Sequence, residues 1–252
     1  MAAYISLLGR GRMNKRVVAV ITIIVVAAVV IAAISYYGLT PKSKELPTST
    51  EHVGGKYNVT LSFFNSSGGQ MEYTDEIGSH SGFMYFEPQM RTGLDWIKNA
   101  TPENAVFLCW WDYGHMIKGY AERNVIVRNP SHEWINMIAE PWRSQVTEFD
   151  SNEKIVDVAN ALTTSNSTET KLIMERYGAS YVVVYEDEYV VAKAGWMCKV
   201  AGLDPLNYTT PTSPLAFTDS GKQMMISRLL DNRDAGFTLI YQDSVMKVYR
   251  KD

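Results

Sequence analysis

An uncharged apolar run near the N-terminus constrains this chain more than any other feature. Residues 17–39, VVAVITIIVVAAVVIAAISYYGL, contain no charged side chain, and as a helix they would be about 34 Å long. The hydrocarbon core of a bilayer is about 30 Å thick, so the run predicts a transmembrane helix. A cleaved signal peptide is the alternative, because basic residues precede the run, but its apolar core is longer than signal peptides use.

The charges beside this run predict its orientation. Residues 1–16 contain four basic residues and no acidic one: Arg10, Arg12, Lys15 and Arg16. The positive-inside rule places such a segment in the cytoplasm. We therefore expect a single-pass protein of the cell membrane, with a cytoplasmic N-terminus and an exterior C-terminal domain formed by residues 57–252.

Residues 40–56, TPKSKELPTSTEHVGGK, separate the run from that domain. They contain two prolines and two glycines without hydrophobic periodicity, a composition typical of a flexible linker. Beyond residue 39 the chain has 20 Lys and Arg against 27 Asp and Glu, so nucleic acid is not an expected partner. The membrane lipid bilayer, in contrast, is an expected partner, because residues 17–39 are predicted to cross it.

Five Asn-x-Ser/Thr sequons agree with an exterior location. They begin at Asn58, Asn65, Asn99, Asn166 and Asn207. Such sequons accept N-linked glycans on the surfaces of exported proteins.

Helices and short apolar strands alternate in the exterior part, which predicts a mixed α/β domain. Strands are expected at residues 57–64, 82–88, 105–109 and 181–185, and a hairpin at 237–243 and 245–251. Helical periodicity or end signals mark residues 87–99, 151–162, 169–178, 187–202 and 220–230. The run AVFLC, residues 105–109, is apolar throughout, as in a strand buried on both faces.

The two cysteines leave two possibilities open. Cys109 and Cys198 could form a disulfide in an oxidising exterior, or they could be two buried thiols, the interpretation we favour. No Cys and His spacing indicates zinc.

The stretch CWWDYGHMIKGY follows the predicted buried strand, so its side chains are expected at a strand end, with Tyr113 and Gly114 in a tight turn. The indoles of Trp110 and Trp111 provide N–H donors and apolar walls, and Asp112 provides an acceptor. Such a pocket can bind one small hydroxyl and reject ligands that lack it. The alternative is that both tryptophans are core residues and Asp112 caps a helix beginning at Tyr113.

The pentapeptide WWDYG resembles the signature of the catalytic subunit of oligosaccharyltransferase, which transfers a lipid-linked oligosaccharide to the asparagine of Asn-x-Ser/Thr. DWIKN, TPENAVFLC and GYAERNVIVRNPSH around it are also similar to the family. The resemblance covers roughly residues 85–200. It implies that Trp110, Trp111 and Asp112 bind the hydroxyl of the residue two positions after the acceptor asparagine.

A second family signature, Asp-x-x-Lys-x-x-x-Met on a later helix, completes that pocket. Lys193 and Met197 match it on one helical face, whereas Val190 stands at the aspartate position. Asp187 and Glu188 lie nearby but out of register. Without the resemblance, Trp196 and Met197 are expected to be core residues.

The chain also departs from the family pattern. Family enzymes have many further membrane helices, with acidic loop residues that bind Mn or Mg. This chain has no Asp or Glu before Glu45, and such a cation needs carboxylates. Asp112 could form a catalytic pair of carboxylates with Glu122, Asp187 or Glu188, but no spacing in the sequence indicates that two of them lie close together. We therefore expect no catalytic residue and no metal ligand in this chain. Mn or Mg is expected in the catalytic half of the enzyme, which this chain does not contain.

Three functions follow from these observations. The favoured one is the C-terminal, acceptor-recognising part of an oligosaccharyltransferase catalytic subunit, not active alone. The chain is then either a fragment of the enzyme or one half of a split enzyme, whose other half is a multi-span membrane protein that supplies the metal and glycan-lipid sites. The second is a non-catalytic, membrane-anchored sequon-binding protein. The third is an exterior sensor or interaction domain whose WWDYG is coincidental.

Overall fold

The computed structural model divides into two compact units, Met1–Lys44 and Glu45–Asp252. It describes residues 49–64, 68–74, 79–81, 89–137, 148–187, 189–233 and 236–252, all in the second unit. The predicted transmembrane run at residues 17–39 lies outside the described residues, as does the basic segment before it. Within the described ranges, no helix has the length and apolar character needed to cross a bilayer.

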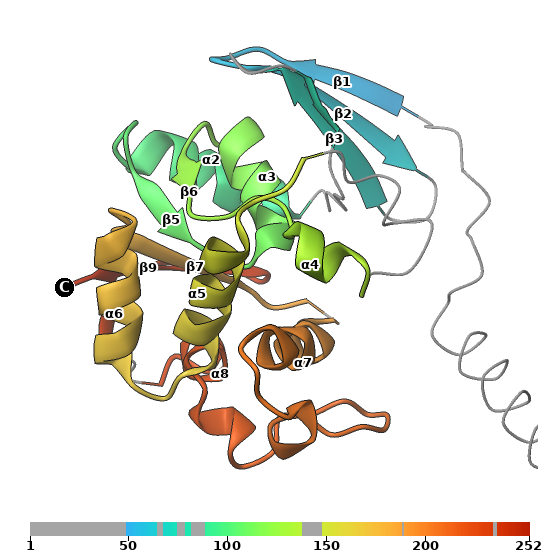
Figure 1. Cartoon of the computed structure of the whole chain (residues 1–252). Helices are drawn as coiled ribbons and strands as arrows, with labels where there is room; N and C mark the ends of the chain where they lie inside the picture. The colour runs from blue at the N-terminus through green and yellow to red at the C-terminus, as the bar shows by residue number, and fades with distance from the viewer. Residues whose placement is uncertain are drawn as a thin grey trace, which may run out of the picture. The chain divides into compact units, whose positions relative to one another are not determined.

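A five-stranded mixed sheet lies at the centre of the second unit, in the order β6-β5-β7-β9-β8 (Figure 1). Its strands are β5 (Val106–Leu108), β6 (Asn124–Val125), β7 (Tyr181–Tyr185), β8 (Phe237–Gln242) and β9 (Met246–Lys251). β5 is parallel to β6 and β7, whereas β9 is antiparallel to β7 and β8. Because β5 and β7 are parallel neighbours, the segments that follow them leave the same edge of the sheet side by side.

Helices connect these strands, as the mixed α/β prediction requires. They are α2 (Met90–Ala100), α3 (Trp111–Gly119), α4 (His132–Ile135), α5 (Asn152–Thr163), α6 (Ser167–Arg176), α7 (Val190–Val200), α8 (Met225–Leu230) and the short 3₁₀ turns η2 (Pro205–Asn207) and η3 (Gly221–Gln223). α5 packs against α6, α7 and α8. Phe107 and Leu108 of β5 are fully buried, which confirms that this strand is covered on both faces. The strand predicted at residues 82–88 lies outside the described residues.

A second sheet of four antiparallel strands precedes the helices, in the order β1-β2-β3-β4. The strands are β1 (Ser49–Val53), β2 (Asn58–Phe64), β3 (Gly68–Thr74) and β4 (Ser79–Ser81). β1 lies inside the expected linker at residues 40–56, so the structure differs from that expectation at residues 49–53. The reason is long-range: β1 pairs with β2 along its whole length, and Glu51 accepts two hydrogen bonds from Arg91 of α2 at 2.9 and 2.8 Å.

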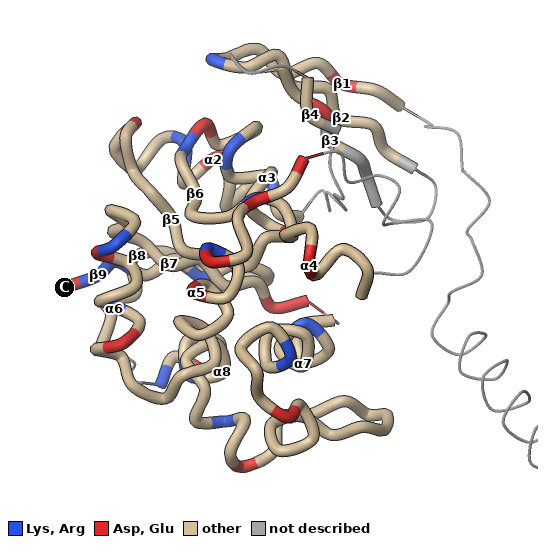
Figure 2. Tube along the Cα trace, viewed as in Figure 1, with Lys and Arg blue, Asp and Glu red and all other residues tan. Residues whose placement is uncertain are grey.

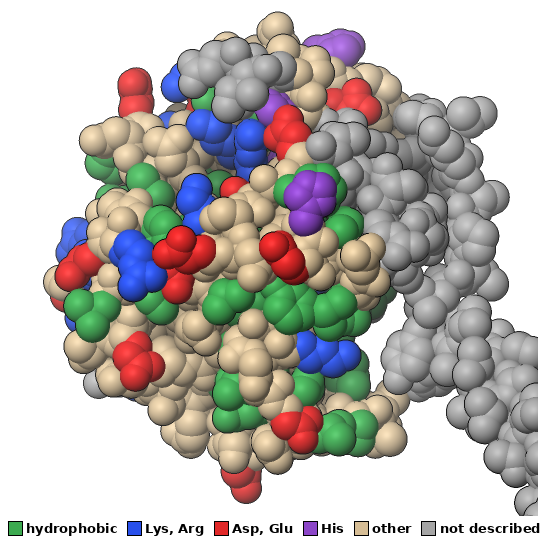
Figure 3. Space-filling view, viewed as in Figure 1, with side chains coloured by type: hydrophobic (Ala, Val, Ile, Leu, Met, Phe, Trp, Pro, Cys, Tyr) green, Lys and Arg blue, Asp and Glu red, His purple; other side chains and the backbone are tan. Residues whose placement is uncertain are grey.

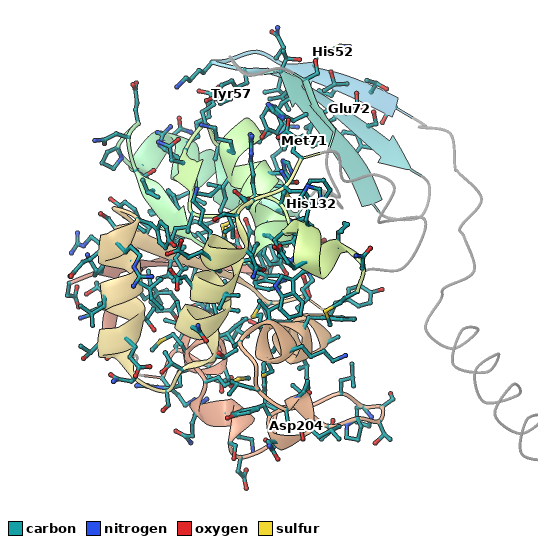
Figure 4. All side chains as sticks on the ribbon, viewed as in Figure 1. His52, Tyr57, Met71, Glu72, His132 and Asp204 are labelled. Atoms are coloured by element: carbon teal, nitrogen blue, oxygen red, sulfur yellow. The ribbon has the colours of Figure 1, made fainter. Side chains whose placement is uncertain are left out.

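One face of this sheet packs on α3. Figure 4 shows Met71 between the sheet and the helices and His52 on the outer side; Met71 is fully buried. Tyr73 contacts α3 through its hydroxyl, 3.5 Å from Nδ1 of His115, whose Nε2 lies 2.6 Å from Oδ1 of Asn129. Burial lowers the pKa of His115 to about 4, so this histidine is neutral at pH 7.

The start of α3 corrects the expected tight turn. The helix begins at Trp111, so Tyr113 and Gly114 lie inside its first turns. Trp110 is extended, with φ −68° and ψ 147°, and Asp112 lies in the first turn, where the helix dipole favours a carboxylate. Gly114 is needed for close packing: a Cβ there would lie 2.2 Å from the carbonyl oxygen of Val127.

Replacing Gly114 by alanine should therefore destabilise the domain by about 1–3 kcal/mol, the usual cost of overpacking. Gly195 is a matched control, because it also lies within a helix and a Cβ there would meet Thr209 Oγ1 at an ordinary 3.4 Å. Gly195→Ala should be neutral or stabilising, since alanine favours helices. Urea unfolding of the full chain in detergent, followed by tryptophan fluorescence, measures both; equal effects of the two substitutions would contradict the packing argument.

Candidate functional site

Two helix starts bring the predicted pocket residues together. Trp110, Asp112 and Tyr113 lie at the β5–α3 junction, and Lys193 and Met197 lie on α7, which follows β7. Since β5 and β7 are neighbours, residues 80 positions apart meet: Lys193 Nζ donates a hydrogen bond to the Tyr113 hydroxyl at 2.5 Å.

A small cavity lies at this meeting point. It offers about 10 Å³ to the centre of a water molecule, roughly the room that one water or one hydroxyl group needs. Most of its wall is apolar. Lys193, Tyr113 and Tyr185 are the lining residues with polar side-chain groups, and the buried Tyr185 hydroxyl has no hydrogen-bond partner among the described residues. The lining residues are Trp110, Tyr113, Leu162, Val183, Val184, Tyr185, Val190, Lys193, Met197 and Ile226.

Trp111 occupies a different position from the one expected of a second pocket wall. It is 8% exposed and lies beside Trp110, with ring centroids 6.3 Å apart and planes at 50°. Neither Trp111 nor Asp112 is among the residues lining the cavity. The role of Trp111 in hydroxyl binding stays a prediction.

Lys193 is the centre of a charge cluster. Its ammonium lies 2.6 Å from Oδ2 of Asp187 and 3.4 Å from Oδ2 of Asp112. The Tyr113 hydroxyl donates to Asp187 Oδ2 at 2.5 Å, and burial raises the pKa of Tyr113 well above its usual value, so the phenol keeps its proton. Lys193 and Lys199 are the basic residues of α7, and both appear in blue along this helix in Figure 2.

Asp187 is the carboxylate nearest to Lys193, although in sequence it does not stand at the aspartate position of the Asp-x-x-Lys pattern. It precedes α7, and its Oδ1 accepts a hydrogen bond from the backbone N–H of Tyr189 at 2.9 Å. This turn folds the carboxylate back over the helix start, where its second oxygen reaches Lys193. Val190, at the family's aspartate position, lines the cavity instead. The signal in the sequence was the aspartate just before the helix, because an Asp side chain can accept a hydrogen bond from the backbone N–H two residues later.

The other carboxylates considered from the sequence lie elsewhere. Glu122 pairs with Lys98 at 2.8 Å and is not part of the cluster, whereas Glu188 lies outside the described residues. Asp112 and Asp187 do converge, which the spacing had not indicated. Lys193 already lies between them, where a metal ion would have to lie, so the pair does not fit a divalent cation. Among the described residues no group of three or more His, Cys, Asp or Glu could hold a metal ion.

Asp112 carries the one unsatisfied group of the cluster. Its Oδ1 is buried and has no hydrogen-bond partner among the described residues. Burial raises the pKa of Asp112 and the nearby Lys193 lowers it, with burial the larger effect. A buried carboxylate oxygen without a donor is costly, and a ligand hydroxyl would supply that donor.

Both cysteines are free and buried, the arrangement we favoured over a disulfide. Cys198 Sγ lies 3.7 Å from Met224 Sδ. Burial raises the pKa of Cys198 to about 11 and that of Cys109 further. Raised pKa values leave both thiols protonated and therefore poor nucleophiles.

Curated relatives with similar sequences share one function in their names. The dolichyl-phosphooligosaccharide-protein glycotransferase of Methanocaldococcus jannaschii is 50% identical over 40 residues, 16% of this chain and 4% of the relative. Subunit stt3 of the dolichyl-diphosphooligosaccharide–protein glycosyltransferase of Schizosaccharomyces pombe is 33% identical over 57 residues, 23% of this chain and 7% of that protein.

The longer alignment is with subunit STT3B of the same transferase from Oryza sativa, 27% identical over 130 residues, 49% of this chain and 15% of the relative. The chain resembles oligosaccharyltransferase catalytic subunits. It spans only 4–15% of the length of these three relatives. No protein-family model matches the chain.

Solved structures of the same kind are distantly similar. The crystal structure of the C-terminal globular domain of an oligosaccharyltransferase from Archaeoglobus fulgidus is 20% identical, with a TM-score of 0.49, covering 66% of this chain and 99% of that one. An oligosaccharyltransferase from the same organism, tethered to an acceptor peptide with an NVT sequon, is 16% identical, with a TM-score of 0.45 over 62% of this chain and 24% of that one.

Replacing each of the two aspartates beside Lys193 by asparagine should have opposite effects on the stability of the domain. Asp187→Asn removes the 2.6 Å partner of Lys193 and should cost about 1–3 kcal/mol of stability. Asp112→Asn should stabilise the domain at neutral pH, because it removes a buried charge that the fold disfavours.

The pH dependence of that gain follows from the pKa direction. The pKa of Asp112 is above its usual 3.8 in the folded protein, so the stability it contributes is fully present below pH 3.8 and lost as pH rises through the folded pKa. The difference in Tm between Asp112→Asn and the parent chain should therefore grow from pH 4 to pH 8. A variant less stable than the parent at pH 8 would contradict this account.

Proposed function

We propose that this chain is the C-terminal, acceptor-recognising part of an oligosaccharyltransferase catalytic subunit. In this proposal Trp110, Trp111 and Asp112 bind the Ser or Thr hydroxyl of Asn-x-Ser/Thr, and Lys193 and Met197 complete the pocket. The metal and glycan-lipid sites belong to a multi-span membrane partner, or to a longer chain of which this is a piece. The chain transfers no glycan alone.

The unpaired Oδ1 of Asp112 is the observation that supports hydroxyl binding best. A hydroxyl is both a donor and an acceptor. It could donate to Asp112 and accept from Lys193, which lines the adjacent cavity. A methyl group in the same place would leave the buried oxygen unpaired, so the pocket would discriminate by chemistry rather than by size.

The charge cluster would orient these groups. Lys193 is fixed by Asp187 at 2.6 Å and by the Tyr113 hydroxyl at 2.5 Å, and Tyr113 stacks on Tyr185 with centroids 4.0 Å apart. An ammonium held by these two partners keeps its direction before the ligand arrives. Preorganisation of this kind lowers the cost of binding.

The surface around α7 suits an extended peptide. Hydrophobic side chains gather around this helix in Figure 3. Tyr189 is 59% exposed and Trp196 is 42% exposed, with the Lys199 ammonium 4.4 Å from the centre of a Trp196 ring. Both Trp196 and Met197 were expected in the core if the motif were coincidental. Trp196 is on the surface, whereas Met197 is 1% exposed and lies in the core. Aromatic side chains that remain exposed beside a pocket are typical of binding surfaces.

Peptide discrimination tests the proposal. Two peptides that differ only in Asn-x-Thr against Asn-x-Val have nearly the same shape, because valine replaces the hydroxyl by a methyl group. Loss of one hydrogen bond to a buried charged acceptor costs about 1.5–3 kcal/mol, so the full chain in detergent should bind the threonine peptide at least about tenfold more tightly.

The Asp112→Ala chain is the matched control, and it should bind both peptides equally weakly. Equal affinity of the parent chain for the two peptides would refute sequon recognition. If discrimination is present but no multi-span protein co-purifies from native membranes, the non-catalytic sequon-binding protein becomes the better assignment.

A further inference from the structure

The chain carries sequons of its own, and the structure distinguishes them. Transfer needs a reachable amide nitrogen on the asparagine and, under the proposed function, a reachable hydroxyl two residues later. Four sequons begin at described asparagines, and all four asparagines are exposed: Asn58, Asn99, Asn166 and Asn207. Asn65 lies outside the described residues. The hydroxyls therefore decide which sequons the folded domain presents.

Two of these hydroxyls are buried and already bonded. Thr101, which belongs to the sequon of Asn99, is 7% exposed; its Oγ1 donates to the Ile97 carbonyl at 2.6 Å and accepts from Arg123 at 3.1 Å. Thr209, which belongs to the sequon of Asn207, is also 7% exposed. These sequons can be recognised only if the surrounding structure unfolds.

The sequon of Asn58 is held in the middle of a sheet. Asn58 lies opposite Thr74 of β3, and Val59 lies between Val53 of β1 and Tyr73 of β3. The Thr60 hydroxyl lies 3.1 Å from Nδ1 of His52. An acceptor peptide must leave its neighbours to enter a pocket, so this sequon would have to break pairing on both sides.

The sequon of Asn166 is different in each respect. Asn166 and Thr168 are both exposed, and the Thr168 hydroxyl makes no hydrogen bond among the described residues. Asn166 caps α6 through Oδ1, which accepts from the Thr168 backbone N–H at 3.0 Å. The cap uses the amide oxygen, whereas a glycan would be attached to Nδ2, so the modification and the cap are compatible.

Presenting this sequon costs little structure. It lies at the first turn of α6, and helix ends open more easily than helix interiors. Exposed hydrogen bonds hold the segment before the helix: the Asn166 backbone N–H donates to Thr164 Oγ1 at 3.1 Å, and Arg228 donates to the Ser165 carbonyl at 2.8 Å. The first buried anchor is Thr170, whose Oγ1 donates to the Ala161 carbonyl at 2.9 Å. An open groove next to the sequon is lined by Thr164, Ser165 and Glu169, which leaves room for an approaching enzyme.

We infer that Asn166 is an N-glycosylation site of the folded domain. In the transfer, a bond forms between Asn166 Nδ2 and the anomeric carbon of a lipid-linked oligosaccharide. The bond from that carbon to the lipid phosphate oxygen breaks, the phosphate leaves with the electron pair, and the amide loses one proton to solvent. This inference rests on the proposed function, because the donor and the transferase must act on the same side of the membrane.

Site occupancy in the native protein tests the inference. The full chain would be isolated from the membranes of its own cells, digested with trypsin and analysed by glycopeptide mass spectrometry, in which residues 155–171 form one peptide containing Asn166. We expect the occupancy at Asn166 to be at least about tenfold higher than at Asn99 or Asn207. This ratio corresponds to a difference of about 1.4 kcal/mol in the free energy of local unfolding.

Matched variants separate modification from folding. Asn166→Asp keeps an oxygen to cap α6 but has no amide nitrogen, so it should lose one glycan mass and keep its Tm. Thr168→Ser should keep the glycan and Thr168→Val should lose it. An unmodified Asn166, or equal occupancy at Asn99 and Asn207, would overturn the inference. Neither result would touch the proposed function, which depends on peptide discrimination through Asp112.

Discussion

The parallel pairing of β5 with β7 is the constraint on which the site depends. Each strand is short, three and five residues, and each is followed within a few residues by a helix. Because their carboxyl ends share one edge of the sheet, α3 and α7 begin side by side. Lys193 can therefore contact Asp112 and Tyr113, and a slip of one residue in the pairing would turn these side chains away from one another.

The same junction keeps a polar atom unpaired inside a well-packed protein. Tyr113 and Asp187 accept hydrogen bonds from Lys193, but Asp112 Oδ1 has no partner among the described residues, and burial raises the pKa of its carboxyl group. A residue chosen only for stability would not be a carboxylate here. Such an unfavourable group is typical of sites where stability has been given up for binding.

The sequence predicted what depends on local pattern, and missed what depends on distant partners. The buried strand before Trp110 follows from its continuous apolar run, and the helix carrying Lys193 follows from the acidic residues at its expected first turn. β1 was missed because its polar residues become a strand only by pairing with β2. Gly114 was assigned to a turn because a glycine's need for space, set here by Val127, looks the same in sequence as a need for a left-handed backbone. Asp187 was missed because a turn, and not helical spacing, carries it to Lys193.

A single contact with a hydroxyl group contributes only a small part of the free energy of peptide binding. One such hydrogen bond contributes about 1.5–3 kcal/mol, far less than tight peptide binding requires. Linked to a second site, however, a weak contact is made at high effective concentration and can decide which peptides stay long enough to react. A small rigid cavity is sufficient for that task. Under the proposed function, Asp112 and Lys193 would recognise the acceptor in this way, and transfer of the glycan would take place elsewhere.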